Sequence, residues 1–320
     1  MQNGDGALTS VLPILGLLGV AGLRILPALQ QVYHLLSLLR GGRPIFDLIV
    51  EELETLQKSA AANAVVGAGK DQILKLDTEL SLEDVVYAYP ETNRSVLAGL
   101  SLTIPVNTTV GIVGGTGAGK TTAIDVLLGL LFPQSGTIKV DDTPVERKTL
   151  RAWQNNVGYV PQQIFLVDAT VAANIAFGVP EHEIDMDAVE RAARLAELHD
   201  FVTGELENGY LEEVGERGIR LSGGQRQRIG IARALYHDPQ VLILDEATSA
   251  LDNLTERAVM DAVHNLGDSK TIIMIAHRLT TVQNCDQIFL LERGKLAAQG
   301  RYEELVETNA TFREMARMVS

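Results

Sequence analysis

A glycine-rich loop is the segment of this sequence whose residue types are best suited to chemistry. It reads Gly114-Gly115-Thr116-Gly117-Ala118-Gly119-Lys120-Thr121 and matches the phosphate-loop pattern G-x-x-x-x-G-K-[ST]. The apolar run TVGIV precedes the loop, and the helical pattern TTAIDVLLGLL follows it. Glycines allow backbone N–H groups to surround a phosphate, and the start of a helix adds partial positive charge. We therefore expect Lys120 to contact the terminal phosphates of a nucleotide and the Thr121 hydroxyl to ligate Mg²⁺.

Two acidic residues, Asp245 and Glu246, directly follow the apolar run Val241–Leu244. Four consecutive apolar residues predict a buried parallel strand, and such sheets bind ligands at the carboxyl ends of their strands. Asp245 is suited to hold Mg²⁺ through water, because this ion keeps most of its hydration shell. Glu246 is suited to polarise the attacking water of an in-line phosphoryl transfer. Together with the loop, these carboxylates predict a nucleotide-hydrolysing site that fits several hydrolase families.

A second glycine-rich segment narrows the choice of family. Its residues are Leu221, Ser222, Gly223, Gly224 and Gln225, and RQRIGIARAL follows them. Serine and glycines opening a helix make a second anion-binding helix N-terminus, although one nucleotide needs only one. The segment resembles the signature motif of ABC ATPases. That resemblance implies a head-to-tail dimer in which Ser222 and Gly224 reach the γ-phosphate held by the partner's phosphate loop.

Four further positions match landmarks of this family: Tyr89, Gln162, the loop Ser249–Asp252, and His277. The resemblance implies that Tyr89 stacks on adenine and that His277 contacts the γ-phosphate. It also implies that Gln162 links Mg²⁺ and the attacking water to the membrane interface, although the adjacent Gln163 leaves the register open. Ser249 and Asp252 would contact the partner subunit.

The expected site residues fall into three groups. The residues expected to bind ATP are Tyr89, Gly114, Gly115, Thr116, Gly117, Ala118, Gly119, Lys120, Thr121 and Thr122. Those expected to hold Mg²⁺ are Thr121, Gln162 and Asp245. Those expected to take part in hydrolysis are Glu246, His277, Gln162 and Lys120.

The apolar stretch Leu8–Leu29 is interrupted only by Thr9, Ser10 and Arg24. It reaches the roughly 20 apolar residues that a membrane-spanning helix needs. A signal peptide is less favoured because no positive charge precedes the stretch, and a buried soluble helix remains the alternative. The positive charges of Arg40 and Arg43 place the following side in the cytoplasm. Arg24 either faces a cavity or extends to the interface.

From Leu80 onward, apolar runs alternate with amphipathic stretches, which predicts an α/β domain with a largely parallel sheet. The expected strands are Thr109–Val113, Val157–Pro161, Val241–Leu244, Thr271–Ala276 and Gln287–Leu291, and the expected helices include Thr121–Leu131 and Met186–Leu198. The resemblance implies a P-loop NTPase, with a RecA-like core and a helical signature subdomain. We expect residues 1–58 to be the end of an exporter's transmembrane domain, 59–79 a linker, and 80–320 the nucleotide-binding domain.

Two segments resemble the exporter branch of the family. Val214–Gly218 is similar to the exporter loop that contacts the membrane domain. The apolar N-terminal segment, running as one transmembrane and cytosolic helix into this domain, resembles the last membrane helix of an exporter half. Within exporters, LRILPALQQVYHLLSLLR followed later by AWQNNVGYVPQQIFL resembles flippases of lipid-linked oligosaccharides. The resemblance implies an ATP-driven exporter in the inner membrane, with this domain on the cytoplasmic side and a lipid-linked saccharide or other lipid as cargo. The implied partners are a second nucleotide-binding domain, as a homodimer, and membrane lipid. Because an exporter half has several membrane helices, the rest of the transmembrane domain, or a separate membrane subunit, is also expected.

Composition excludes some classes of function. The net charge of −14 disfavours a nucleic-acid binder, which needs clustered Lys and Arg. Cys285 is the only cysteine, so the chain forms no internal disulfide. Two alternatives remain: a soluble ABC-type ATPase clamp, and the ATPase subunit of an importer. The resemblance implies long coiled coils or a second ATPase copy for the clamp, and this sequence shows neither; the apolar N-terminal segment and Val214–Gly218 disfavour the importer subunit.

Overall fold

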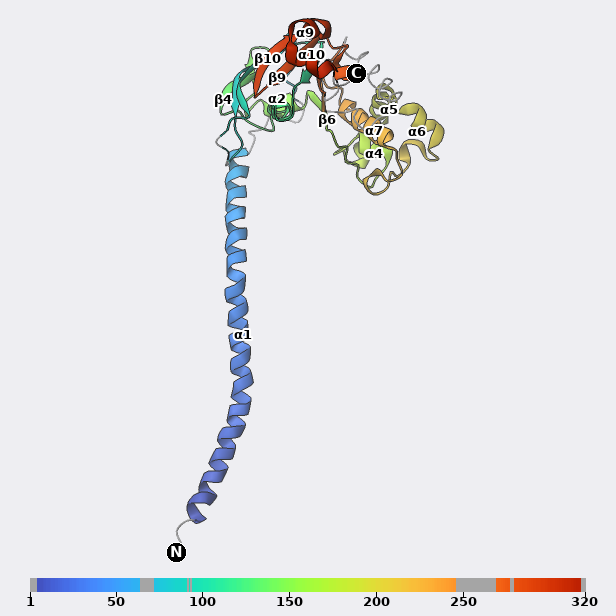
Figure 1. Cartoon of the computed structure of the whole chain (residues 1–320). Coiled ribbons are helices and arrows are strands. Elements are labelled where there is room, and N and C mark those ends of the chain that lie inside the picture. The colour runs from blue at the N-terminus through green and yellow to red at the C-terminus, as the bar shows by residue number, and fades with distance from the viewer. Residues whose placement is uncertain are drawn as a thin grey trace. The chain divides into compact units, whose positions relative to one another are not determined.

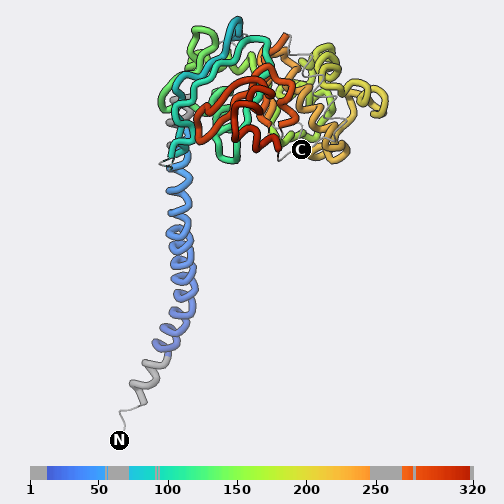
Figure 2. The backbone as a smooth tube through the Cα atoms, turned by 45° about the horizontal axis from the view of Figure 1, so that its top comes forward, coloured from blue at the N-terminus to red at the C-terminus, as the bar shows by residue number. Residues whose placement is uncertain are grey.

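The computed structural model describes residues 5–63, 72–90, 92, 94–245, 269–276 and 279–317. The chain divides into two units, residues 1–64 and residues 65–320. Figures 1 and 2 show the first unit as one long helix and the second as a domain of sheets and shorter helices.

The helix of the first unit, α1, runs from Asp5 to Asn63 and contains Pro13, Pro27 and Pro44. Its segment Pro13–Glu54 is long and apolar enough to cross a membrane. At 1.5 Å per residue, the 59 residues span about 88 Å, whereas the apolar part of a bilayer is about 30 Å thick. A helix of this length is longer than the apolar part of a bilayer is thick, and it ends past the expected domain boundary at residue 58.

A largely parallel sheet lies at the centre of the second unit. In the described part of the chain its strand order is β10-β9-β3-β8-β7-β6, and every neighbouring pair except β10–β9 is parallel. The strands are β3 (Thr109–Val113), β6 (Val157–Val160), β7 (Val241–Asp245), β8 (Thr271–Ile275), β9 (Gln287–Glu292) and β10 (Lys295–Gly300). All residues of β3, β7 and β8 are buried, which explains their continuous apolar runs. The predicted α/β class is confirmed.

Two helices are shorter than the sequence predicted. The helix after β3, α2, spans Lys120–Leu127 rather than continuing to Leu131, because Gly129 takes a left-handed conformation (φ 67°) that ends it. Likewise α5 spans Met186–Leu195, and the left-handed Glu197 (φ 53°) follows.

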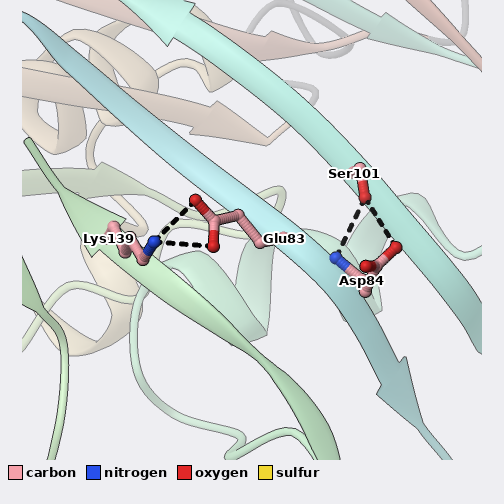
Figure 3. A network of polar contacts seen from close by, with 4 residues as sticks. All are labelled: Glu83, Asp84, Ser101 and Lys139. Atoms are coloured by element: carbon pink, nitrogen blue, oxygen red, sulfur yellow. Dashed lines mark hydrogen bonds and ion pairs between the residues drawn. The ribbon is translucent and has the colours of Figure 1, made fainter. Parts of the chain in front are cut away.

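A second, antiparallel sheet has the strand order β2-β1-β4-β5 and was not predicted. Its strands are β1 (Glu79–Tyr87), β2 (Leu97–Pro105), β4 (Ser135–Val140) and β5 (Thr143–Pro144). Figure 3 shows how β1 is held on both sides: Lys139 of β4 forms an ion pair with Glu83 (2.7 Å), and Ser101 of β2 accepts a hydrogen bond from the Asp84 N–H (2.9 Å).

An irregularity in β1 lies at Asp84, whose φ of 47° is left-handed, and the register with β2 shifts between Leu82 and Val85. Gly136 of β4 lies so close that an added Cβ would be 2.4 Å from the Asp84 carbonyl oxygen. Glycine is therefore required at position 136. The strand then continues to Tyr87, which sets the place of Tyr89 just beyond it.

Four helices, α4 (Val171–Ile175), α5, α6 (His199–Glu205) and α7 (Gly223–Leu235), gather at the end of the domain away from β4 (Figures 1 and 2). Short turns of 3₁₀ helix connect the chain there and elsewhere: η1 (Glu181–Glu183), η2 (Gly209–Leu211), η3 (Glu216–Gly218) and η4 (Leu279–Val282). The remaining helices are α3 (Leu150–Gln154), α9 (Tyr302–Thr308) and α10 (Ala310–Arg317). The four gathered helices share one apolar core with one face of the parallel sheet, while the other face packs with the antiparallel sheet.

Candidate functional site

The carboxyl edge of the parallel sheet brings the predicted chemistry together. The glycine-rich loop follows β3, Gln162 follows β6, and Asp245 ends β7. Strand β8 lies between β3 and β7, and β6 pairs with β7, all in parallel. Since parallel strands end at the same edge, these residues share one side of the sheet.

The loop itself depends on glycines at specific positions. Gly114 has a φ of 154°, and an added Cβ there would lie 2.3 Å from the Leu291 carbonyl oxygen. Gly119 is left-handed (φ 101°) and directly precedes α2. The Gly294 N–H donates to the Ala118 carbonyl (2.9 Å), which fixes the loop against the β9–β10 turn. The backbone can therefore approach a ligand closely and in a fixed shape.

Lys120 begins α2 and is 6% exposed. Its Nζ donates to the carbonyl oxygens of Gly114 (2.8 Å) and Gly115 (3.3 Å), so the ammonium group folds back over the loop. The positive charge is thus held beside the N-terminus of a helix, where an anion is favoured.

Tyr89 lies beside the start of α2. Its hydroxyl is 3.2 Å from the Thr122 hydroxyl, and its ring meets Tyr87 edge to face at 5.2 Å. The Tyr89 side chain is 40% exposed, so part of its surface is open to a ligand. Tyr89 follows β1 of the antiparallel sheet, and the structure brings it next to the glycine-rich loop, which follows β3 of the parallel sheet.

Asp245 is buried at the end of β7, and the Tyr159 hydroxyl of β6 donates to its Oδ2 (3.5 Å). Burial, together with Asp245 and Asp125, raises the pKa of Tyr159 to about 12, so its hydroxyl keeps its proton. Burial also raises the pKa of Asp125 on α2. Neither Tyr159 nor Asp125 was expected at the site from the sequence. The spacing of Thr121 and Asp125, one helical turn apart, was the available signal.

The oxygen donors at this edge fit Mg²⁺. They are the Asp245 carboxylate, the Thr121 hydroxyl and the Gln162 side-chain amide, and this ion typically binds one or two carboxylates together with substrate phosphates. Within the described ranges, no group of three or more His, Cys, Asp or Glu residues is placed to hold a metal. The donor set therefore suits an ion shared with a nucleotide. Gln162 and Gln163 are both exposed, which leaves their register open.

The second glycine-rich segment forms the start of α7 as predicted. Ser222 is the N-cap: its Oγ accepts from the Gln225 N–H (3.2 Å), and its own N–H donates to the Gln225 side chain (2.8 Å). This reciprocal pair is a capping box. Leu221 is buried, whereas Ser222 is exposed. The segment therefore presents a well-formed helix N-terminus to the surface.

The loop Val214–Gly218 is built from left-handed residues: Gly215, Arg217 and Gly218 have φ values of 73°, 53° and 67°. Arg226 of α7 donates to the carbonyl oxygens of Leu221 (2.6 Å) and Gly218 (3.4 Å), which joins this loop to the start of α7. Beside the loop, Ile219 is 81% exposed.

Several predicted site residues cannot be placed. Glu246, Ser249, Asp252 and His277 lie outside the described residues. Their roles remain predictions.

Comparison with known proteins identifies the relatives of this domain. Residues 97–249 match the family model described as "ABC transporter", a range that includes the glycine-rich loop, Ser222 and Asp245. The chain is 38% identical over 283 residues to the ATP-dependent lipid A-core flippase of Saccharophagus degradans, which covers 88% of this chain and 46% of the relative. It is 36% identical over 291 residues to the multidrug resistance protein 1 of Entamoeba histolytica, covering 90% of this chain and 21% of the relative.

Among solved structures, a bacterial Atm1-family ABC exporter with ATP bound matches with a TM-score of 0.72 and 36% identity. The match covers 78% of this chain and 43% of that chain. The chain thus spans less than half the length of these relatives.

Proposed function

This chain carries the ATPase domain of the ABC transporter family, of the exporter type, and we propose that it is the ATP-hydrolysing engine of a membrane exporter. The observation that carries the proposal is the edge of the parallel sheet, where the glycine-rich loop with Lys120 follows β3 and the carboxylate of Asp245 ends β7, with only β8 between these two strands. Such a site holds a nucleoside triphosphate by backbone N–H groups, one ammonium and a shared cation.

In this proposal Tyr89 stacks on the adenine, while the loop from Gly114 to Thr122 surrounds the phosphates. Lys120 already lies within the loop, so binding a phosphate requires only that its Nζ exchange or share its carbonyl partners. Thr121, Gln162 and Asp245 would hold Mg²⁺, which neutralises charge on the phosphates when it is bound.

Hydrolysis needs a base and a positioned water. Glu246, directly after Asp245, is proposed to polarise that water, with Gln162 and His277 completing the site. The protonated Tyr159 hydroxyl donates to Asp245 and keeps that carboxylate oriented toward the sheet edge.

A second copy of the domain is proposed to supply the signature segment. Ser222 is exposed at the start of α7, and the helix N-terminus there favours an anion. In a head-to-tail homodimer, two ATP molecules would each lie between one phosphate loop and the partner's Leu221–Gln225, with Ser249 and Asp252 contacting the partner. The two domains of the dimer would separate again after hydrolysis.

The membrane part of the proposal depends on α1. Its apolar length supports a membrane-spanning role, and the charges of Arg40 and Arg43 support a position of the ATPase domain on the cytoplasmic side of the inner membrane. We assign residues 1–58 to the end of a transmembrane domain, 59–79 to a linker and 80–320 to the ATPase domain. The rest of the transmembrane domain, or a separate membrane subunit, encloses the cargo path.

The cargo is proposed to be a lipid-linked saccharide or another lipid. The relatives named lipid A-core flippases, at 38–42% identity, support a lipid cargo. The exporter relatives do not favour a soluble clamp or an importer subunit.

The test is ATP hydrolysis by the purified chain in lipid vesicles. Lys120→Ala is expected to lower turnover at least about 100-fold, since it removes the positive charge from the loop. Lys148→Ala is the matched control, because that lysine is exposed and, among the described residues, its ion pair is with Glu146 of its own turn. Equal turnover in all three proteins would exclude the proposed site.

A further inference from the structure

Residues 72–79 enter the domain along the edge of the parallel sheet that lies opposite the nucleotide site. This segment is firmly held there. The Leu74 N–H donates to the Ala152 carbonyl (2.9 Å), and the Leu76 side chain is 1% exposed within the core. The chain that leads from the membrane helix is thus part of the domain before its first strand begins.

Two side-chain amides, those of Asn156 and Gln240, make three hydrogen bonds to this segment. Asn156 is 2% exposed, and its Nδ2 donates to the Leu74 carbonyl (2.8 Å) and to the Gln240 Oε1 (2.7 Å). Gln240 Oε1 also accepts from the Leu76 N–H (3.0 Å), and the Gln240 Nε2 donates to the Leu76 carbonyl (3.4 Å). Each amide therefore bonds both to the entering segment and to its counterpart.

Asn156 and Gln240 also connect β6 and β7, the two strands that lead to Gln162 and Asp245. Asn156 directly precedes β6, and Gln240 directly precedes β7. The Gln240 N–H donates to the Asn156 Oδ1 (3.0 Å), and the Val241 N–H donates to the Asn156 carbonyl (3.2 Å). From this point the strands run in parallel register, Val157 beside Val241, toward Gln162 and Asp245.

A displacement at this pair must be carried along both strands. The five residues of β7 are buried, so the strand is packed on both faces and moves as one body. At about 3.3 Å per residue, its far end lies roughly 13–17 Å from Gln240. The pair thus stands at one end of the strands and the catalytic groups at the other.

We propose that Asn156 and Gln240 are positioning residues, an amide clamp that couples the segment entering from the membrane helix to the placement of Gln162 and Asp245. The catalytic half of this inference rests on the proposed ATPase function, whereas the mechanical half rests on the hydrogen bonds alone.

The chain offers a matched control at the same segment. Asp141, in the β4–β5 turn, accepts hydrogen bonds from the N–H groups of Thr78 (2.8 Å) and Glu79 (2.9 Å). It therefore holds the entering segment to the antiparallel sheet, away from β6 and β7. Asp141→Asn loosens the segment without touching the clamp.

The mechanical half is tested by amide hydrogen exchange on the full chain. Measured relative to the exchange of β3 and β9 in the same protein, which corrects for any change in global stability, Asn156→Ala is expected to speed exchange at least about tenfold over residues 157–163 and 241–245, while Asp141→Asn leaves this ratio within about twofold of wild type. An unchanged ratio in Asn156→Ala, or an equal change in Asp141→Asn, would overturn the clamp.

The catalytic half is tested by kcat per bound ATP, with the bound fraction measured separately. Gln240→Ala is expected to lower kcat about tenfold with an unchanged KM for ATP, because the phosphate loop follows β3 and Tyr89 follows β1. Asp141→Asn leaves both amides in place and is expected to keep kcat within about twofold of wild type. A normal kcat in Gln240→Ala, or an equal loss in Asp141→Asn, would overturn the positioning role. These two variants also keep the proposal falsifiable if Asn156→Ala fails to fold.

A wild-type chain without ATPase activity would contradict the proposed function, and the exchange experiment would still decide the clamp.

Discussion

The attachment of the entering segment to the antiparallel sheet predicts a specific loss of stability in Asp141→Asn. The Asp141 carboxylate accepts hydrogen bonds from the N–H groups of Asp77, Thr78 and Glu79 and from the Thr78 hydroxyl (2.6 Å). Burial acts to raise the pKa of Asp141, but these hydrogen bonds outweigh it and lower the pKa from 3.8 to about 2. An asparagine keeps the shape and loses the charge that strengthens each bond.

The magnitude follows from this pKa. At 1.36 kcal/mol for each pH unit, the lowering corresponds to about 2 kcal/mol, which solvent screening at this partly exposed turn reduces to about 1–2 kcal/mol. For a domain of this size, 1 kcal/mol changes the melting temperature by about 2–4 °C. We therefore expect Asp141→Asn to melt about 2–8 °C below wild type at pH 7.

The lowered pKa determines in which direction the stability changes with pH. Because the folded-state pKa is below the ordinary value, the carboxylate stabilises the fold fully above about pH 4, and this contribution is lost as the pH falls toward about 2. Thermal unfolding of both proteins in detergent, from pH 7 down to pH 3, measures the difference. It is expected to be constant above pH 5 and to shrink below pH 4. Equal melting temperatures at pH 7, or a difference that grows on acidification, would refute the reasoning.

Two further predictions concern the nucleotide. Tyr89→Ala is expected to weaken ATP binding about tenfold or more by fluorescence titration, since base stacking contributes about 1–3 kcal/mol; Tyr89→Phe, which loses only the contact with the Thr122 hydroxyl, is expected to stay within about threefold. An equal loss in both variants would assign the effect to the hydroxyl. Gly114→Ala is expected to abolish ATP binding, because its Cβ would lie 2.3 Å from the Leu291 carbonyl oxygen. Gly99→Ala also alters a glycine of positive φ but has open space, so it should leave ATP affinity unchanged, and normal binding by Gly114→Ala would contradict the loop geometry.

The parallel sheet could be predicted because its strands are buried on both faces. Continuous apolar runs such as Val241–Leu244 are then required, and the observed ends differ from the predicted ones by about one residue. The antiparallel sheet escaped prediction because β1 alternates irregularly: Glu83 and Asp84 are both exposed at the register shift, which breaks the period of two.

The sequence predicted the site's geometry best where a motif forms its contacts within a few residues. The glycine-rich loop and the start of α7 each bond mainly within a few residues, so their spacing predicts their geometry. Tyr159 meets Asp245 from a neighbouring strand, and Asn156 meets Gln240 across 84 residues of sequence. Single tyrosines and amides have no characteristic spacing, so only the fold reveals these pairs.

Cross-linking two copies of the chain tests the head-to-tail arrangement around bound ATP. Thr116 of the phosphate loop is exposed, and so is Arg220 just before the signature segment. Cysteines at these two positions can be joined by a short bis-maleimide. The native Cys285 does not interfere, because burial and the nearby Asp286 raise its thiol pKa to about 12. Lys148 replaced by cysteine and paired with the same Arg220→Cys is the control.

Thr116→Cys/Arg220→Cys chains are expected to form a covalent dimer with ATP present and little without it, while the Lys148→Cys pair forms none. A dimer that forms equally without ATP, or equally in the Lys148→Cys pair, would contradict the head-to-tail arrangement around bound nucleotide.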